Sequence, residues 1–120
     1  MKAELNKQLG ALGVAVPENP DGEVPQDYQA ELKAFLGGFD FMKLGQAVNR
    51  KQWESAMMTI RRMEQRCDAL GLEGFKRSFA GIRQAVVRKD VLQAKQLLAA
   101  VIQRRVRLFE LLSDHSGFKD

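Results

Sequence analysis

The feature that most constrains the fold is a long series of apolar residues, spaced three and four positions apart, between residues 52 and 70. The side chains in this series are Trp53, Ala56, Met57, Ile60, Met63, Cys67 and Leu70. This spacing places them along one side of an α-helix, and the series is too long for an ordinary β-strand. Gly71 then predicts the end of the helix. Other elements must cover this apolar side, because a helix with one apolar stripe buries it against a neighbour.

The rest of the chain contains further stripes of the same kind. In four further segments, beginning at about residues 26, 40, 73 and 91, they consist of Tyr28, Leu32, Phe35; Leu44, Ala47, Val48; Phe75, Phe79, Ile82, Val86; and Val91, Ala94, Leu97, Leu98, Val101, Leu108, Leu111. No segment alternates apolar and polar residues as a half-buried strand does. Short connections between amphipathic helices favour antiparallel neighbours. We therefore predict an all-α fold, an antiparallel up-and-down four-helix bundle with additional N-terminal helical segments.

Glycines and acidic residues predict the ends of these helices. Gly37 and Gly38 interrupt the helical pattern, and Asp40 is placed to be the N-cap of the next helix. Asp90 and Gln93 have the D-x-x-Q spacing of a capping box, in which each residue caps the other's backbone N–H.

The predicted organisation has three parts. Residues 1–25 contain a short N-terminal helix and a linker that holds all 3 prolines. Residues 26–114 form the helical bundle, and residues 115–120 form a polar tail. Prolines and an Asp-Gly pair break regular structure, which is why we predict a linker before residue 26.

Charge and cysteine content limit the function classes. The net charge is +4, but 15 acidic residues are interspersed among 19 basic ones, so we do not expect a nucleic-acid partner. No segment is apolar enough to span a bilayer, and we expect no membrane partner. The N-terminus has charges where a signal peptide needs an apolar stretch, and Cys67 is the only cysteine. We expect a cytoplasmic protein.

The residues that usually carry catalysis are nearly absent. The chain has one histidine, His115 in the polar tail, and one cysteine that the apolar stripe turns inward. These cannot form a zinc site of four ligands, and no phosphate-binding glycine loop is present. We expect no enzymatic activity and no cofactor.

One ten-residue pattern occurs twice. AVNRKQWESA (residues 47–56) is similar to AVVRKDVLQA (residues 85–94), at an offset of 38 (85 − 47). Arrays of helical repeats need about three units, so two copies are too few. We interpret the two copies as similar turns between helices of one bundle.

The order of these parts resembles a histidine-containing phosphotransfer (HPt) domain over residues 39–112. NRKQW (residues 49–53) stands at the family's first turn, and RRMEQ (residues 61–65) stands at its H-x-L-K-G motif. CDALG (residues 67–71) matches the small-residue stretch and Leu-Gly. RKDV (residues 88–91) stands at the second turn, and residues 94–98 carry the leucine-alanine stripe. The resemblance implies a phosphorelay scaffold.

The chain departs from that family at its chemical centre. Arg61 stands where the family has its phosphorylated histidine, Glu64 replaces the lysine and Gln65 replaces the glycine. A guanidinium stays protonated and is a poor nucleophile, so phosphoryl transfer is not expected. The resemblance then implies a non-catalytic module that docks a receiver (response-regulator) or histidine-kinase domain. The docking face would consist of Met58, Arg61, Arg62, Glu64, Gln65 and Arg66.

Three alternatives remain open from the sequence. The arginines around residue 61 could be an ordinary solvated basic surface. The chain could be a helical-repeat-like scaffold for another protein or peptide, which an apolar groove between helices would favour. It could also be a basic nucleic-acid-binding bundle, which would need its arginines clustered on one face. The sequence also leaves a homodimer open.

Overall fold

The computed structural model describes the backbone of residues 2–11, 14 and 26–116, and the side chains of residues 7–11, 14 and 26–113. Its helices are α1 (Lys2–Ala11), α2 (Gln26–Leu36), α3 (Asp40–Asn49), α4 (Trp53–Leu70), α5 (Glu73–Val87) and α6 (Val91–Ser116). No β-strand forms in these residues; Val14 and Leu72 make a single isolated bridge. The all-α prediction is therefore confirmed. The proline-rich segment 15–25 lies outside the described residues.

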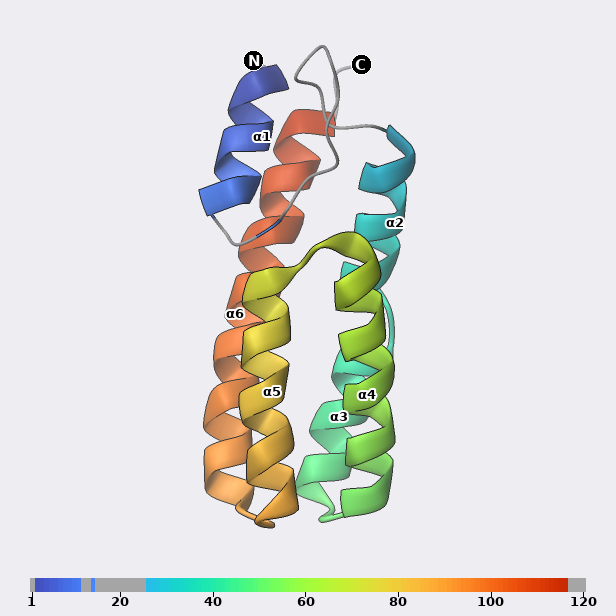
Figure 1. The fold of residues 1–120 in the computed structure, drawn as a ribbon, viewed down its shortest axis with the longest axis vertical. Helices are drawn as coiled ribbons and strands as arrows, with labels where there is room; N and C mark the ends of the chain where they lie inside the picture. Colours follow the sequence, from blue (N-terminus) through green and yellow to red (C-terminus); the bar gives the residue numbers. More distant parts are fainter. Residues whose placement is uncertain (1, 12–13, 15–25, 117–120) are drawn as a thin grey trace.

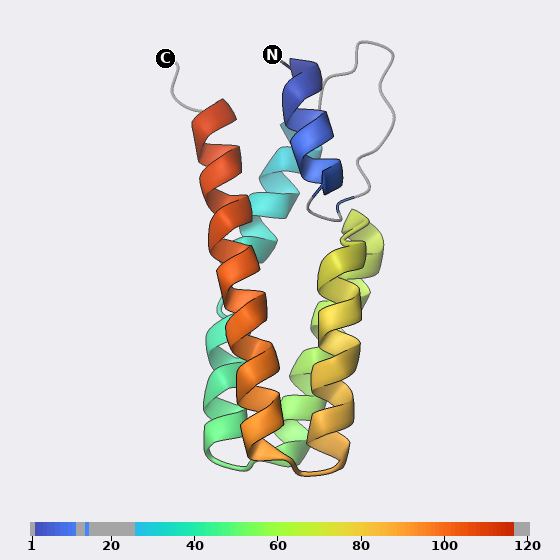
Figure 2. The same ribbon diagram turned by 90° about the vertical axis from the view of Figure 1, so that its left-hand side faces the viewer.

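Neighbouring helices lie side by side along the long axis of the molecule (Figure 1). α4 packs on α3 and α5, α5 packs on α6, and α6 also packs on α3. α2 precedes α3 and packs on α4 and α6, while α1 packs on α6. Figure 2 shows the α3–α4 and α5–α6 turns at the lower end, with α1 and α2 near the opposite end. α6 has 26 residues, about 39 Å at 1.5 Å per residue. It therefore extends from the end with the α5–α6 turn to the end with α1 and α2 (Figure 2).

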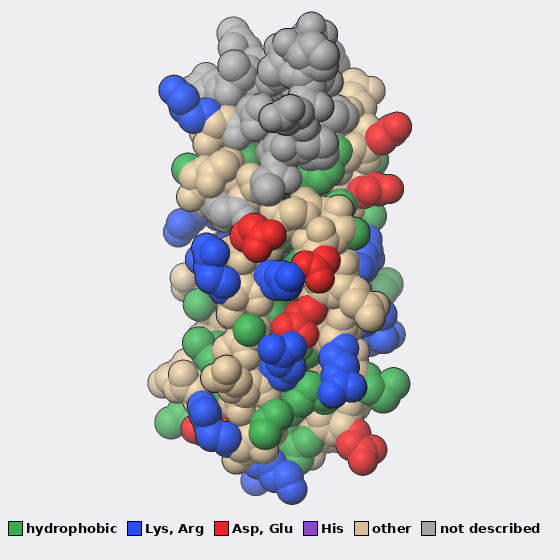
Figure 3. Space-filling view, viewed as in Figure 1, with side chains coloured by type: hydrophobic (Ala, Val, Ile, Leu, Met, Phe, Trp, Pro, Cys, Tyr) green, Lys and Arg blue, Asp and Glu red, His purple; other side chains and the backbone are tan. Residues whose placement is uncertain are grey.

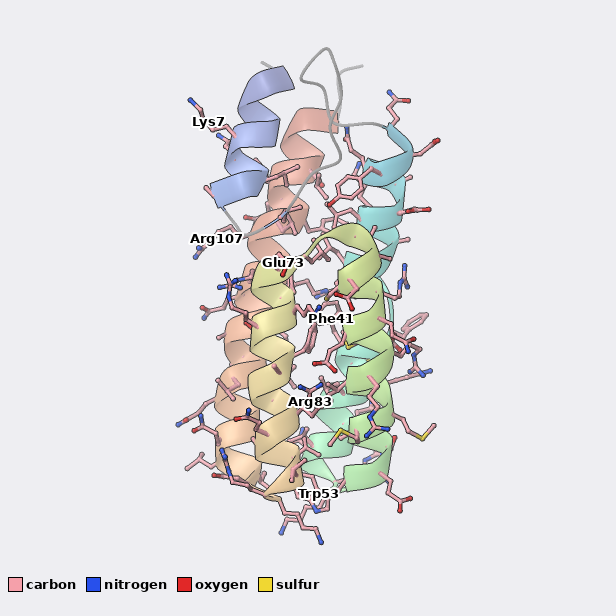
Figure 4. The ribbon with its side chains drawn as sticks, in the orientation of Figure 1. Lys7, Phe41, Trp53, Glu73, Arg83 and Arg107 are labelled. Atoms are coloured by element: carbon pink, nitrogen blue, oxygen red, sulfur yellow. The ribbon has the colours of Figure 1, made fainter. Side chains whose placement is uncertain are left out.

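The apolar stripes meet in one core whose centre is aromatic. Phe35 of α2, Phe41 of α3, and Phe75 and Phe79 of α5 are all buried. The rings of Phe35 and Phe41 meet edge-on with centroids 5.4 Å apart, and those of Phe75 and Phe79 stack at 6.5 Å. Aromatic pairs in such geometries add stability beyond the area that they bury. Figure 4 shows Phe41 between the helices.

Most residues that the spacing places inward are buried, including Ile60, Met63, Cys67 and Leu108. A few lie at the edge of the core and are only half-buried: Trp53, Met57, Val91, Leu97 and Leu111. The N-terminal segment also contributes to the core, because Leu9 and Val14 are buried.

Three connections share one turn geometry. In each, a residue in the left-handed conformation follows a helix: Lys51 (φ 58°), Gly71 (φ 71°) and Lys89 (φ 57°). The next N–H returns to a carbonyl five residues back, from Gln52 to Ala47 (2.8 Å), Leu72 to Cys67 (2.9 Å) and Asp90 to Ala85 (2.9 Å). This is the Schellman arrangement, which satisfies carbonyls left free at a helix end. Gly71 ends α4 as predicted.

The two similar sequence patterns correspond to two of these turns. Residues 47–52 and 85–90, here called the twin turns, have matching backbone bonds, including Lys51 to Val48 (3.1 Å) and Lys89 to Val86 (2.9 Å). The interpretation of the repeat as two similar helix turns therefore agrees with the structure.

Gly37 and Gly38 separate α2 from α3, as the sequence predicts. The Gly37 N–H still bonds to Lys33 O at 2.8 Å, but the helix ends at Leu36. The side chain of Arg105 on α6 contacts both helices at this break. Its Nε donates to the Leu36 carbonyl, and its guanidinium lies 5.1 Å from the centroid of the Phe41 ring.

Two cap predictions need correction. Asp40 is not the N-cap of α3, because Phe39 occupies that position and makes no side-chain cap; the Asp40 carboxylate binds Arg62 instead. The Asp90 carboxylate does accept the Gln93 N–H at 3.1 Å. The reciprocal half of that capping box is missing, because the Asp90 N–H is already used in the twin turn.

The C-terminal helix is longer than expected. α6 continues to Ser116, so residues 115 and 116 belong to the helix and not to a polar tail beginning at residue 115. The remaining residues, 117–120, lie outside the described part of the chain.

Candidate docking face

α4 brings four of the six residues predicted for docking to one exposed side. Met58, Arg61, Arg62 and Gln65 follow one another at steps of three, one and three residues, and all four are exposed. This spacing places them on one side of the helix, opposite the buried stripe of Ile60, Met63 and Cys67. Here this exposed side is called the α4 face.

Arg62 forms an ion pair with Asp40 of α3. Its Nη2 lies 2.9 Å from Asp40 Oδ1, and its Nε lies 3.2 Å from Asp40 Oδ2. This two-pronged pairing fixes the guanidinium, and the hydrogen bond and charge of Asp40 raise the pKa of Arg62. Phe39, the residue before Asp40, exposes 72% of its surface beside this pair.

Glu64 lies away from the α4 face, on the side towards α5. Both of its carboxylate oxygens accept from Arg83 Nη1, at 2.8 and 2.9 Å. Only 13% of the Glu64 side chain is exposed. Arg83 points from α5 towards α4 in Figure 4. Glu64 therefore joins two helices and is not placed to meet a partner.

Arg66 lies at the border between α4 and α2. Its guanidinium carbon is 5.5 Å from the centroid of the Phe35 ring, within the range of a cation–π contact. Gln65 is exposed on the α4 face.

Arg61 differs from Arg62 in its partners among the side chains that the structure describes. Among the side chains of residues 7–11, 14 and 26–113, no carboxylate lies within ion-pair distance of it. Its neighbour Met58 exposes 67% of its surface. The α4 face thus combines a guanidinium that has no ion pair with any described side chain and an exposed apolar side chain, which suits contact with an acidic partner.

A second exposed apolar surface lies between α3 and α6, and sequence reasoning missed it. Two adjoining hollows share Gly37 and Arg105. The exposed apolar residues around them are Phe39, Met42, Ile102, Val106 and Phe109, and the buried Phe41 lies beneath. Here this surface is called the α3–α6 groove. The steps of four and three between Ile102, Val106 and Phe109 are a second stripe on α6 that the sequence already contains.

The remaining charged side chains of α4 and α5 form a mixed surface. Figure 3 shows acidic and basic groups interspersed over this side of the molecule. Besides the Glu64–Arg83 pair, Lys76 Nζ binds Asp68 Oδ1. The charges within each pair neutralise one another, and acidic groups interrupt the basic ones on this side (Figure 3).

The chemistry of the described residues is limited. Within residues 2–11, 14 and 26–116, no three His, Cys, Asp or Glu residues are close enough to hold a metal ion. Cys67 is fully buried, and burial raises the pKa of its thiol from 9.0 to about 12, so the reactive thiolate is suppressed. No helix in this part of the chain is long and apolar enough to cross a bilayer.

Comparisons with protein-family models, curated proteins and solved structures found no match. The resemblance to HPt domains therefore rests on the residues quoted from the sequence.

Proposed function

We propose that this chain is a non-catalytic, HPt-like docking module of phosphorelay signalling. In this proposal α3 to α6 are the antiparallel up-and-down four-helix bundle, and α1 and α2 are its N-terminal additions. A receiver or histidine-kinase domain docks on the α4 face, and no phosphoryl group is carried.

The observation that carries the proposal is the position of Arg61. It stands at the phosphoacceptor position of the resemblance, on the exposed side of α4 opposite the buried side chains of Ile60 and Met63. It has no acidic partner among the described side chains, whereas Arg62 and Glu64 each have one. An exposed guanidinium without an internal partner is free to bind a carboxylate of another molecule.

The docking mechanism follows from guanidinium chemistry. The phosphorylation pocket of a receiver domain is acidic, and a guanidinium offers a carboxylate two parallel N–H donors. Met58 and Phe39 supply apolar contact area on either side of the charges. Phosphate transfer is not part of the mechanism, because arginine does not act as a nucleophile at physiological pH.

Titration against receiver domains, with and without beryllofluoride activation, tests this function. Saturable binding that Arg61→Ala weakens about tenfold or more supports the proposal, since a charge-assisted contact contributes about 1.5–3 kcal/mol. Arg77→Ala is the matched control, because Arg77 is an exposed arginine on α5. Absence of saturable binding, or equal losses in the two variants, would contradict docking through the α4 face.

Arg61→His separates docking from lost chemistry. If this variant takes a phosphoryl group from a phosphorylated receiver, the position is that of a phosphoacceptor whose nucleophile has been replaced. If it binds the receiver without taking the group, the surroundings of position 61, including the exposed Gln65, also prevent transfer.

The α3–α6 groove favours the second candidate function, a scaffold for another protein or peptide. Exposed apolar residues grouped around one hollow often mark an interaction site. Val106→Asp places a charge in this groove on α6, whereas Arg61 lies on α4. Loss of a bound partner in Val106→Asp but not in Arg61→Ala would move the scaffold function to first place.

A further inference from the structure

The twin turns place four cations at one end of the molecule. Arg50 and Lys51 belong to the α3–α4 turn, and Arg88 and Lys89 belong to the α5–α6 turn. All four side chains are exposed. Figures 1 and 2 show both turns at the same end, and here this set of four residues is called the basic pole.

Acidic residues only partly balance this charge. Glu54 and Asp90 are the acidic residues in the adjoining first turn of α4 and at the start of α6, so the end carries +2 (4 − 2). The Asp90 carboxylate is already used to cap the Gln93 N–H. The C-termini of α3 and α5 carry negative partial charges that attract cations. The N-termini of α4 and α6 also lie here, and their positive partial charges offset that attraction.

The backbone gives a second reason to assign a role to the two lysines. Lys51 and Lys89 adopt a left-handed conformation that glycine accepts without a steric cost. The third turn of this geometry, at the opposite end of α4, does use glycine, at residue 71. The chain thus has lysine at both turns of the basic pole, where glycine would fit the backbone better.

Apolar side chains accompany the cations at this end. Val87 ends α5 and exposes 67% of its surface, and Leu92 near the start of α6 exposes 68%. Trp53 at the start of α4 is half-buried and lies at the lower end in Figure 4. Exposed aliphatic groups beside lysines and arginines match the two layers of a bilayer surface, which has anionic headgroups above acyl chains.

We propose that the basic pole binds the surface of an anionic lipid bilayer. The cations contact lipid phosphates and carboxylates, while Val87 and Leu92 enter the headgroup region. The sequence led us to expect no membrane partner because no segment can span a bilayer, but peripheral binding needs no spanning segment. The exposed aliphatic side chains of Val87 and Leu92 favour a bilayer over a nucleic acid, because a phosphate backbone offers them no apolar layer to enter. This contact does not depend on docking at the α4 face.

Trp53 is the single tryptophan, so its fluorescence reports on this end without a label. The protein is titrated with phosphatidylcholine vesicles that contain or lack phosphatidylserine, and binding is also measured by co-sedimentation. We expect a change in Trp53 emission and co-sedimentation only with phosphatidylserine, both reversed by raised salt.

Lys51→Gly combined with Lys89→Gly should lower the partition coefficient about thirtyfold, from about 1 kcal/mol per basic residue near the membrane. These substitutions suit the backbone, so lost binding cannot be attributed to unfolding; circular dichroism checks this. Arg77→Gln combined with Arg107→Gln is the control, because it removes the same charge from exposed positions away from the pole. Figure 4 shows Arg107 well above Trp53.

Three results would overturn the proposal. They are no binding to phosphatidylserine vesicles at low salt, equal losses in the two double variants, and tighter binding of an oligonucleotide through the same lysines. Arg61→Ala should bind vesicles like the unmodified protein. Its behaviour with receivers and with vesicles therefore separates a failure of the proposed function from a failure of the membrane contact.

Discussion

Replacing Lys51 and Lys89 by glycine should stabilise the protein. A residue with a Cβ atom in the left-handed conformation costs about 1–2 kcal/mol. Glycine avoids this cost but loses about 0.5–1 kcal/mol more in backbone entropy on folding. The difference is a gain of about 0.5–1 kcal/mol at each turn. Because the two turns lie in separate connections, the gains should add to about 1–2 kcal/mol in the double variant.

Thermal and urea unfolding followed by circular dichroism measure this gain. For a chain of 120 residues, about 4 °C of melting temperature corresponds to 1 kcal/mol, so the double variant should melt about 4–8 °C higher. Alanine is the control substitution, because it removes the charge and the long side chain but keeps the Cβ atom. Lys51→Ala with Lys89→Ala should give little or no gain. If the glycine variant is no more stable than the alanine variant, the reasoning from backbone strain is wrong.

Three further predictions concern other parts of the structure. Gln52 is the N-cap of α4 and makes no side-chain cap, so Gln52→Asp should add about 1 kcal/mol in urea unfolding; an unchanged midpoint would contradict this. Arg105→Met should cost about 2 kcal/mol, because it leaves a carbonyl of α2 without its donor, whereas Arg107→Met should cost almost nothing. Burial raises the pKa of Cys67 from 9.0, and that of Tyr28 from 10.0, to about 12. The unfolded chain therefore loses these protons first, and the free energy of unfolding should fall as the pH rises from about 9 to 12; Cys67→Ala should make that fall shallower.

The helices were predictable because their signals are local. The apolar spacing of α4, the end of α4 at Gly71 and the break at Gly37 depend on residues close together in the sequence. The similarity of the twin turns was also visible there, although lysine gives no sign of the left-handed backbone that it adopts. A repeated sequence can reveal a repeated turn before the geometry of that turn is known.

The candidate site was less predictable because long-range pairs decide it. The exposed side of α4 follows from helical spacing, and Arg61 and Met58 lie there. That Asp40 binds Arg62, 22 residues away, and does not cap its own helix is a property of how α3 packs on α4. Glu64 of α4 likewise pairs with Arg83 of α5. The spacing of residues within one helix does not indicate which charged residue of a neighbouring helix will pair with them.

The second stripe of α6 was present in the sequence but hidden by the first. Val101 and Leu108 are buried, and Ile102 and Phe109, one position later, lie on the exposed side. When apolar residues occupy so much of a helix's circumference, the sequence pattern does not indicate which side is buried in the bundle. Only the packing of α3 against α6 decides it.

The contact between Arg105 and the end of α2 affects which part of the molecule unfolds locally. α1 and α2, taken as a group, pack on α4 and α6 less extensively than α3 to α6 pack on one another. Local opening of such a group exposes less surface than global unfolding. Backbone amides of α1 and α2 should therefore exchange with solvent faster than those of α4 and α5. The Arg105 side chain, which binds the end of α2 from α6, then contributes to the free energy of that partial opening.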